Sequence, residues 1–276
     1  MKPADLSEEP TRGGRHLGWL GLLTTLLTGA TFAVAYTTPP RSGPLCTTGC
    51  IPPPYTDAAR FVPRDYLWMY PAILVTMLII VLVAAVTVHP MSPGRGLLGR
   101  GSLVMVGIGA GVLILDYGIQ LAVVQPMLSL GEADGLGFLT QYHPHGVFIG
   151  LEDIGYTALA VGFLLAGAGL TPVRRAEQVI RWVLGLGGAI VVAALAVMAP
   201  MYGSDLAYRF ELVAISVTWL AVVLVGAALA VAHLRRARPA SSRGAGPAEA
   251  SPAAYPSSAQ EVRDQRAESL HGSGTS

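Results

Sequence analysis

The chain has 276 residues, of which 52% are hydrophobic and only 13% are charged, and its formal net charge is +1. An average soluble domain has roughly 25% charged residues, so this composition excludes an ordinary soluble protein. A net charge this close to zero gives no reason to expect nucleic acid or another acidic polymer as a partner.

Long apolar stretches with few charges account for most of the chain. Each is long enough, at about 1.5 Å per helical residue, to cross a hydrocarbon layer about 30 Å thick. We therefore expect an all-α, polytopic transmembrane helix bundle, with the lipid bilayer as its partner. The transmembrane domain should cover residues 17–238, with spans near 17–38, 67–89, 102–125, 146–170, 179–200 and 209–234.

Polar tails are expected on both sides of this domain. Residues 1–16 form a short N-terminal tail, and residues 239–276 are rich in Ala, Ser, Pro and Gly. Such a composition cannot bury enough apolar surface to offset the entropy of ordering, which predicts a disordered C-terminal tail.

Basic residues predict the orientation in the membrane, because Lys and Arg accumulate on the side that is not translocated. They lie before the first span, between the second and third spans, between the fourth and fifth spans, and after the sixth span. We expect both termini in the cytoplasm and the protein in a bacterial plasma membrane. The basic residues on this side are Lys2, Arg12, Arg15, Arg95, Arg100, Arg174, Arg175, Arg181, Arg235, Arg236, Arg238 and Arg243.

The first apolar stretch has a second interpretation. It ends in Ala33-Val34-Ala35, which resembles the cleavage site of a signal peptide. The stretch is longer than the usual apolar region of such a peptide, which favours a retained span. Cleavage within residues 17–35 stays open as the alternative.

The two cysteines, Cys46 and Cys50, lie together in the first outer loop, residues 39–66. A zinc site needs four ligands at set spacings, and this pair has no nearby set of His or acidic partners. A disulfide is expected if the loop faces an oxidising compartment, and two free thiols are the alternative.

Pairs of glycines four residues apart occur within the spans, at Gly107 and Gly111 and at Gly146 and Gly150. Small residues let helix backbones approach closely in lipid. We expect packing between helices of one chain, and a homo-oligomer formed through these faces is the alternative.

Polar side chains recur in the outer halves of three spans. Asp116 and Gln120 belong to the third span, Glu152, Asp153 and Tyr156 to the fourth, and Arg209 opens the sixth, while His143 and His145 precede the fourth. Ionisable groups within a membrane are costly, so they predict a functional site by default. The spacing predicts an outward-facing polar pocket formed by Asp116, Gln120, His145, Glu152, Asp153, Tyr156 and Arg209.

Three chemical interpretations of this pocket remain open. Asp116 and Glu152 could share a proton, because two close carboxylates in a low dielectric cannot both ionise easily, which suits proton-coupled transport or sensing of a small solute. His143 and His145, with Glu152 and Asp153, could instead bind a divalent metal such as zinc and form a membrane enzyme. Arg209 could neutralise Asp116 or Glu152 as a buried ion pair in a structural or interaction protein.

The sequence assigns no catalytic residue. It contains no G-x-S-x-G motif, phosphate-binding loop, dinucleotide-binding fingerprint or zinc-protease helix motif. Enzymatic activity is therefore the less favoured interpretation.

Overall fold

The computed structural model describes residues 12–56, 63–88 and 96–234, which form helices and loops and contain no β-strand. Six helices in these ranges are long and apolar enough to span a membrane, as predicted. Large apolar side chains such as Leu74, Leu115 and Leu220 are more than half exposed, which provides a surface for lipid to cover. The chain is therefore a multi-pass membrane protein. Its spanning helices are α1 (Arg12–Tyr36), α2 (Met69–Val88), α3 (Gly96–Ile119), α6 (Val147–Gly169), α7 (Arg175–Tyr202) and α8 (Ala207–Leu234).

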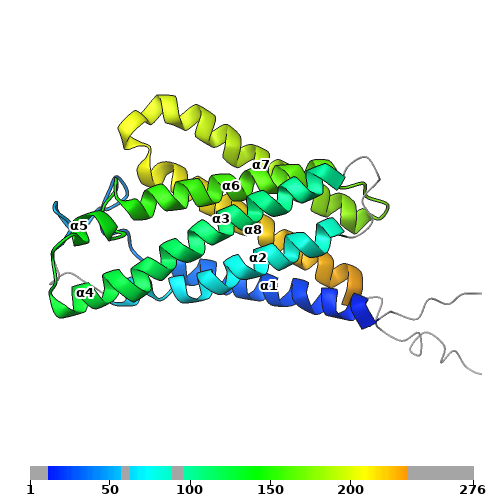
Figure 1. Cartoon of the computed structure of the whole chain (residues 1–276), viewed down its shortest axis with the longest axis horizontal. Coiled ribbons are helices and arrows are strands. Elements are labelled where there is room, and N and C mark those ends of the chain that lie inside the picture. The colour runs from blue at the N-terminus through cyan, green and yellow to red at the C-terminus, as the bar shows by residue number, and fades with distance from the viewer. Residues whose placement is uncertain (1–11, 57–62, 89–95, 235–276) are drawn as a thin grey trace, which may run out of the picture. The chain divides into compact units, whose positions relative to one another are not determined.

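The long helices run side by side and pack in a closed order (Figure 1). Helix α1 contacts α2 and α8, α3 contacts α2 and α6, and α7 contacts α6 and α8. Helix α6 also contacts α8 across the bundle, and it has the largest buried share of the six spans. Residues of α6 are therefore placed where several helices can surround them.

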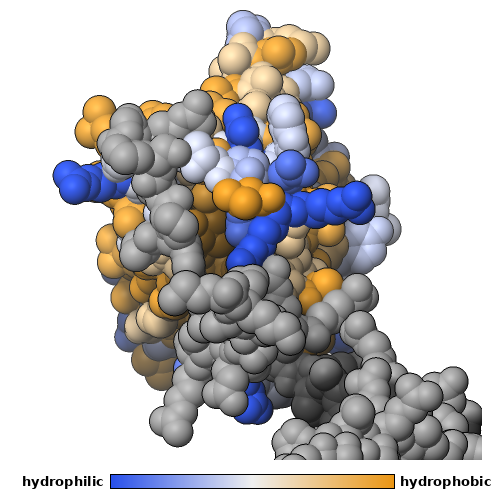
Figure 2. Space-filling view, turned by 90° about the vertical axis from the view of Figure 1, so that its right-hand side faces the viewer, coloured by the Kyte–Doolittle hydropathy of each residue, from blue (hydrophilic) through white to orange (hydrophobic). Residues whose placement is uncertain are grey.

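The bundle has two chemically different ends. Helix α1 begins and α8 ends at the arginine end, which also holds Arg15, Arg100, Arg174 and Arg175. Figure 2 shows hydrophilic residues gathered on this end and hydrophobic residues along the flank behind it. The opposite end, which we call the disulfide end, holds the loop between α1 and α2.

Helix α1 begins earlier than predicted. Residues 12–16, which we expected in a polar tail, form its first turn, whereas residues 1–11 and 239–276 lie outside the described residues. Along α1, a Cβ on Gly21 would collide with the backbone of Gly226 in α8. This close packing makes α1 part of the bundle.

The third span is longer than predicted, because the helix continues beyond α3. A π-helix, η3 (Gln120–Val124), lies at the end of the predicted span 102–125, and α4 (Gln125–Leu130) extends the helix into the predicted loop at 126–145. Within the same residues α5 (Leu136–Leu139) forms another turn. Pro126 stands in the first turn of α4, next to the wide π turn. At this position the missing N–H of proline does not end the helix.

Close contact between α3 and α6 uses different glycines from those predicted. A Cβ on Gly109 would lie 2.6 Å from the carbonyl oxygen of Gly155, so only glycine permits this approach. Gly107, Gly111 and Gly150 face open space, and the expectation that they pack within the chain is wrong.

Candidate functional site

A cavity of about 390 Å³ opens at the disulfide end of the bundle, which we call the disulfide-end cavity. The end of α1, the loop after it, the segment just before α2, the loop before α6 and the first turns of α8 surround it. Its volume falls within the range of about 300–1,000 Å³ that small-molecule sites occupy. Aromatic side chains form much of its wall, and the charged residues in the wall are Arg41, Asp65 and Glu211.

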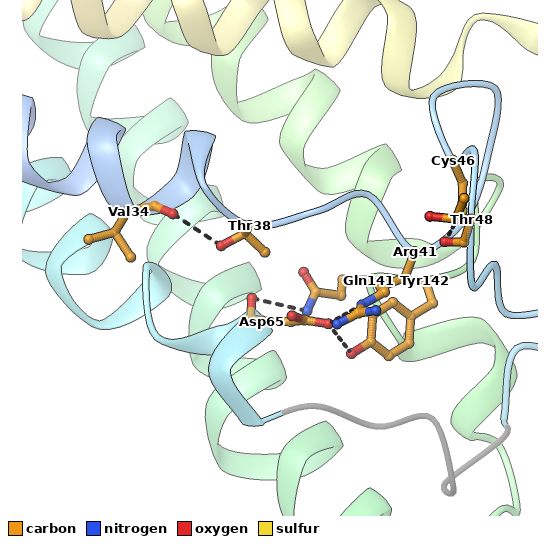
Figure 3. Close-up of polar contacts among 8 residues, drawn as sticks. All are labelled: Val34, Thr38, Arg41, Cys46, Thr48, Asp65, Gln141 and Tyr142. Atoms are coloured by element: carbon orange, nitrogen blue, oxygen red, sulfur yellow. Dashed lines mark hydrogen bonds and ion pairs between the residues drawn. The ribbon is translucent and has the colours of Figure 1, made fainter.

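Arg41 and Asp65 form an ion pair in this wall. The Arg41 Nε donates to Asp65 Oδ2 at 2.9 Å, and the Tyr142 hydroxyl donates to the same oxygen at 3.3 Å. Figure 3 shows the three side chains pointing toward one another, with Gln141 beside them. The hydrogen bond to Asp65 raises the pKa of the Arg41 guanidinium, and burial raises the pKa of the Tyr142 hydroxyl. Arg41 therefore stays charged and Tyr142 neutral, and the pair contributes no net charge to the cavity.

Tyr208 of α8 ties the surrounding loops together. Its hydroxyl donates to the carbonyl oxygen of Gln141 at 2.8 Å, so the 2.8 Å contact with Ser42 is donated by Ser42. Gly43 lies against the Tyr208 ring at φ 70°, where a Cβ would overlap the ring. The cavity wall is thus held by specific contacts between loops that are far apart in sequence.

A chain of buried hydrogen bonds runs from the cavity wall into the bundle, and we call it the tyrosine chain. Trp219 of α8, which lines the cavity, donates its Nε1 proton to the Tyr156 hydroxyl at 3.0 Å. The hydroxyls of Tyr156 and Tyr117 are 2.8 Å apart, and Tyr117 donates to Glu152 Oε1 at 2.9 Å. Because Tyr117 donates its single hydroxyl proton to Glu152, Tyr156 must donate to the Tyr117 oxygen. All donors in the tyrosine chain therefore point toward Glu152.

Glu152 belongs to a group of acidic side chains from three helices. Glu211 of α8 lies within hydrogen-bonding reach of Glu152, and Asp116 of α3 is their acidic neighbour. One carboxylate oxygen of each of the three is buried without a hydrogen-bond partner. Glu211 also lines the cavity. Close carboxyl groups in a low dielectric cannot all be ionised at low cost, so this arrangement is suited to holding and exchanging a proton.

The close approach of α3 and α6 explains how these groups meet. Tyr117 follows Gly109 by about two helical turns, and Tyr156 is the neighbour of Gly155. With the two backbones in contact at the glycines, the tyrosines reach each other across the interface. Trp68, which lines the cavity, packs edge-on against Tyr117, with ring centroids 5.3 Å apart.

Other predicted site residues lie elsewhere. Gln120 binds the backbone of the following loop, donating to the Leu139 carbonyl and accepting from the Gln141 N–H at 3.1 Å. The Arg209 guanidinium lies 4.8 Å from the centre of the Tyr202 ring, and among the described residues it forms no ion pair with Asp116 or Glu152. Asp153 has a buried oxygen without a partner, but it does not line the cavity.

The predicted metal site is not assembled. His143 Nδ1 accepts the His145 N–H at 3.0 Å, and His145 Nε2 contacts the Ser204 carbonyl oxygen at 2.8 Å. Burial and then the neighbouring His145 lower the pKa of His143. Within the described ranges, no group of three or more His, Cys, Asp or Glu residues could hold a metal ion, so Glu152 and Asp153 do not join the histidines.

The cysteine pair is a disulfide, as the sequence predicted. Cys46 and Cys50 are bonded, with their Cα atoms 5.9 Å apart. The bond closes a small loop next to Leu45, which lines the cavity. It lies at the opposite end of the bundle from the arginine end.

Sequence reasoning missed the residues that link the cavity to the acidic group. Glu211 stands near the start of the sixth span, where a charge looks like an ordinary interface residue, and Tyr117 and Trp219 look like core aromatics. The detectable signal is an acid in each of three spans at the same end of the bundle. Comparison with protein families, with characterised proteins and with solved structures finds no match to this chain.

Proposed function

We propose that this protein binds a small solute in the disulfide-end cavity and couples its binding to a proton held by Glu211 and Glu152. One observation carries the proposal: Glu211 lines the cavity and also adjoins the buried Glu152. A solute that contacts Glu211 changes the electrostatic energy of both carboxyl groups. Coupling of this kind is the elementary step of a proton-linked carrier or of a sensor.

The tyrosine chain supports the coupling. Its donors all point toward Glu152, so they stabilise a negative charge there once the proton leaves. Trp219 stands at the cavity end of this chain, which gives a bound solute a second contact with the same network. The sequence-based prediction placed the shared proton on Asp116 and Glu152, and the geometry favours Glu211 and Glu152 with Asp116 as a neighbour.

Tryptophan fluorescence tests the proton step. Trp19 and Trp182 are more than half exposed, so Trp19→Phe/Trp182→Phe leaves Trp68 and Trp219, which both line the cavity, as reporters. In this background we expect a pH-dependent change in emission that Glu211→Gln and Glu152→Gln each remove. Glu132→Gln, which changes an exposed acid, is the matched control and should leave the transition intact. An identical transition in all variants would contradict the proposal.

We further propose that the arginine end faces the cytoplasm and the disulfide end faces the outside of a bacterial plasma membrane. The arginine distribution supports this orientation, and a disulfide persists in an oxidising compartment. A reporter enzyme that works only in the cytoplasm should therefore be active when it is fused to the C-terminus. Activity instead from a reporter that works only after export would place the cavity on the cytoplasmic side.

A further inference from the structure

The charged residues of the disulfide-end cavity do not balance. Arg41 and Asp65 neutralise each other through a 2.9 Å ion pair, which leaves the Glu211 carboxyl as the remaining acidic group in the wall. Glu211 Oε2 is buried without a hydrogen-bond partner, and no cation of the described residues lies within 4.0 Å of it. When Glu211 is ionised, the cavity therefore carries one negative charge that no cation among the described residues neutralises.

The remainder of the wall is suited to a cation. Phe32, Tyr36, Trp68 and Trp219 line the cavity. The face of an aromatic ring is negative, and a ligand cation within about 6 Å of its centre is attracted, most strongly by Trp. Phe32 meets Trp219 edge-on, with centroids 6.1 Å apart, while Trp68 is tilted against Trp219 at 6.3 Å. Such rings also provide apolar contact area for an organic ligand.

Internal cations are engaged elsewhere. The Arg209 guanidinium, two residues before Glu211, lies on the Tyr202 ring and does not line the cavity. Arg41 is held by Asp65 at the wall. Neither side chain is placed to neutralise Glu211, so the missing charge has to come from a ligand or from a proton.

We infer that the ligand of this cavity is an organic cation, an ammonium group on an apolar body, which binds Glu211 and the aromatic wall in competition with a proton. This inference rests on the proposed function. The ammonium group takes the place of the proton on the Glu211 carboxyl, and that proton is released to solvent, so the charge of the site is the same before and after exchange. The titratable groups near Glu211 are Glu152, Asp153 and Tyr156 of α6, Asp116 of α3 and Tyr208 of α8, and the Arg41–Asp65 pair lines the same cavity.

Three probes of similar size and different charge test the inference on the whole protein in detergent. They are benzyltrimethylammonium, benzyl alcohol and benzenesulfonate, and binding is followed by the emission of Trp68 and Trp219 in the Trp19→Phe/Trp182→Phe background. We expect saturable binding of the cation at least about tenfold tighter than that of the other two, a difference of about 1.4 kcal/mol. Cation binding should release protons into weakly buffered solution and should tighten as the pH rises.

Glu211→Gln should weaken cation binding about tenfold and remove the proton release, while Glu132→Gln should change neither. The selectivity among the three probes needs no variant, so it tests the inference even if Glu211→Gln fails to fold. Equal or tighter binding of the neutral or anionic probe, binding of no probe, or cation binding that Glu211→Gln leaves unchanged would each overturn the inference. The proposed proton coupling would survive these results if the pH transition of Trp fluorescence still depended on Glu211 and Glu152.

Discussion

The two ends of the bundle each hold a cavity with at least one acidic residue in its wall, and Glu177 at the arginine end differs from Glu211 at the disulfide end in its partners. At the arginine end, a cavity of about 280 Å³ is lined by Arg174, Glu177 and His233 among apolar residues. Glu177 Oε2 accepts the backbone N–H groups of Val173 and Arg174 at 2.8 and 3.2 Å, so it caps the start of α7. Glu211 at the disulfide end has a buried oxygen with no such partner.

This difference separates a structural acid from a candidate functional one. A carboxylate that accepts the N–H groups of its own helix end already has its negative charge stabilised within the protein, so it gains less from a ligand. A buried carboxylate without a partner costs free energy in the empty protein, and a proton or a cation removes that cost. The comparison therefore predicts that changes at the disulfide end affect ligand and proton responses, whereas changes at the arginine end affect stability alone.

The largest effect on stability should come from the ion pair in the wall of the disulfide-end cavity. Asp65→Ala removes the acceptor of both Arg41 and Tyr142, and we expect a loss of about 2 kcal/mol in the free energy of unfolding. Chemical denaturation in mixed micelles measures it, with Asp134→Ala, an exposed acid, as the control. A loss no greater than that of the control would show that the pair does not hold the wall.

A smaller loss is expected from the tyrosine chain. Tyr117→Phe leaves Glu152 Oε1 and the Tyr156 proton without their partner, which should cost about 1–2 kcal/mol and change the pH transition of Trp219 emission. Tyr70→Phe, in which the residue is more than half exposed and does not line the cavity, is the matched control. If stability falls but the pH transition is unchanged, the tyrosine chain is structural and is not coupled to the proton.

At the arginine end, Glu177→Ala removes the cap of α7 and should cost about 1 kcal/mol. Binding of benzyltrimethylammonium and the pH transition should stay unchanged, because Glu177 is part of the other cavity. Changed cation binding in this variant would remove the distinction between the two ends.

The smallest effect should come from His143, whose lowered pKa makes it a second source of pH dependence at the disulfide end. Burial lowers its pKa, so the unfolded chain takes up the proton at a higher pH than the folded chain does. Its contribution to stability is complete above the ordinary imidazole pKa of about 6.5 and is lost as the pH falls through that value toward the lower folded one. His143→Phe should slightly reduce the loss of stability on acidification.

The measurement for His143 is the slope of unfolding free energy against pH, because protonation of Nδ1 also breaks its hydrogen bond with the His145 N–H, so both effects appear in the same slope. His16→Phe at the arginine end is the control. An unchanged slope in His143→Phe would assign the acid sensitivity of the disulfide end to the carboxyl group network.

Sequence alone determined the number and the approximate ends of the spans, because the length and apolar character of a segment are local properties. In lipid, each backbone polar group must find a partner within its own helix, so an apolar stretch of this length has one favourable structure. The disulfide also followed from local spacing. Where the prediction failed locally, as at Pro126, the π turn before it allowed the helix to continue.

The candidate site was decided by tertiary structure. Gly107 and Gly109 are two residues apart, about 200° around the helix, and only Gly109 meets α6. That rotation brings Tyr117 to Glu152 and Tyr156, and the contact of α6 with α8 adds Glu211. Gln120, His145 and Arg209 have polar groups of the expected kinds, but their helices and loops direct them to backbone carbonyls and to a tyrosine ring. Which face of each helix packs against its neighbours depends on contacts between segments that are far apart in sequence, and the local pattern of residues does not determine those contacts.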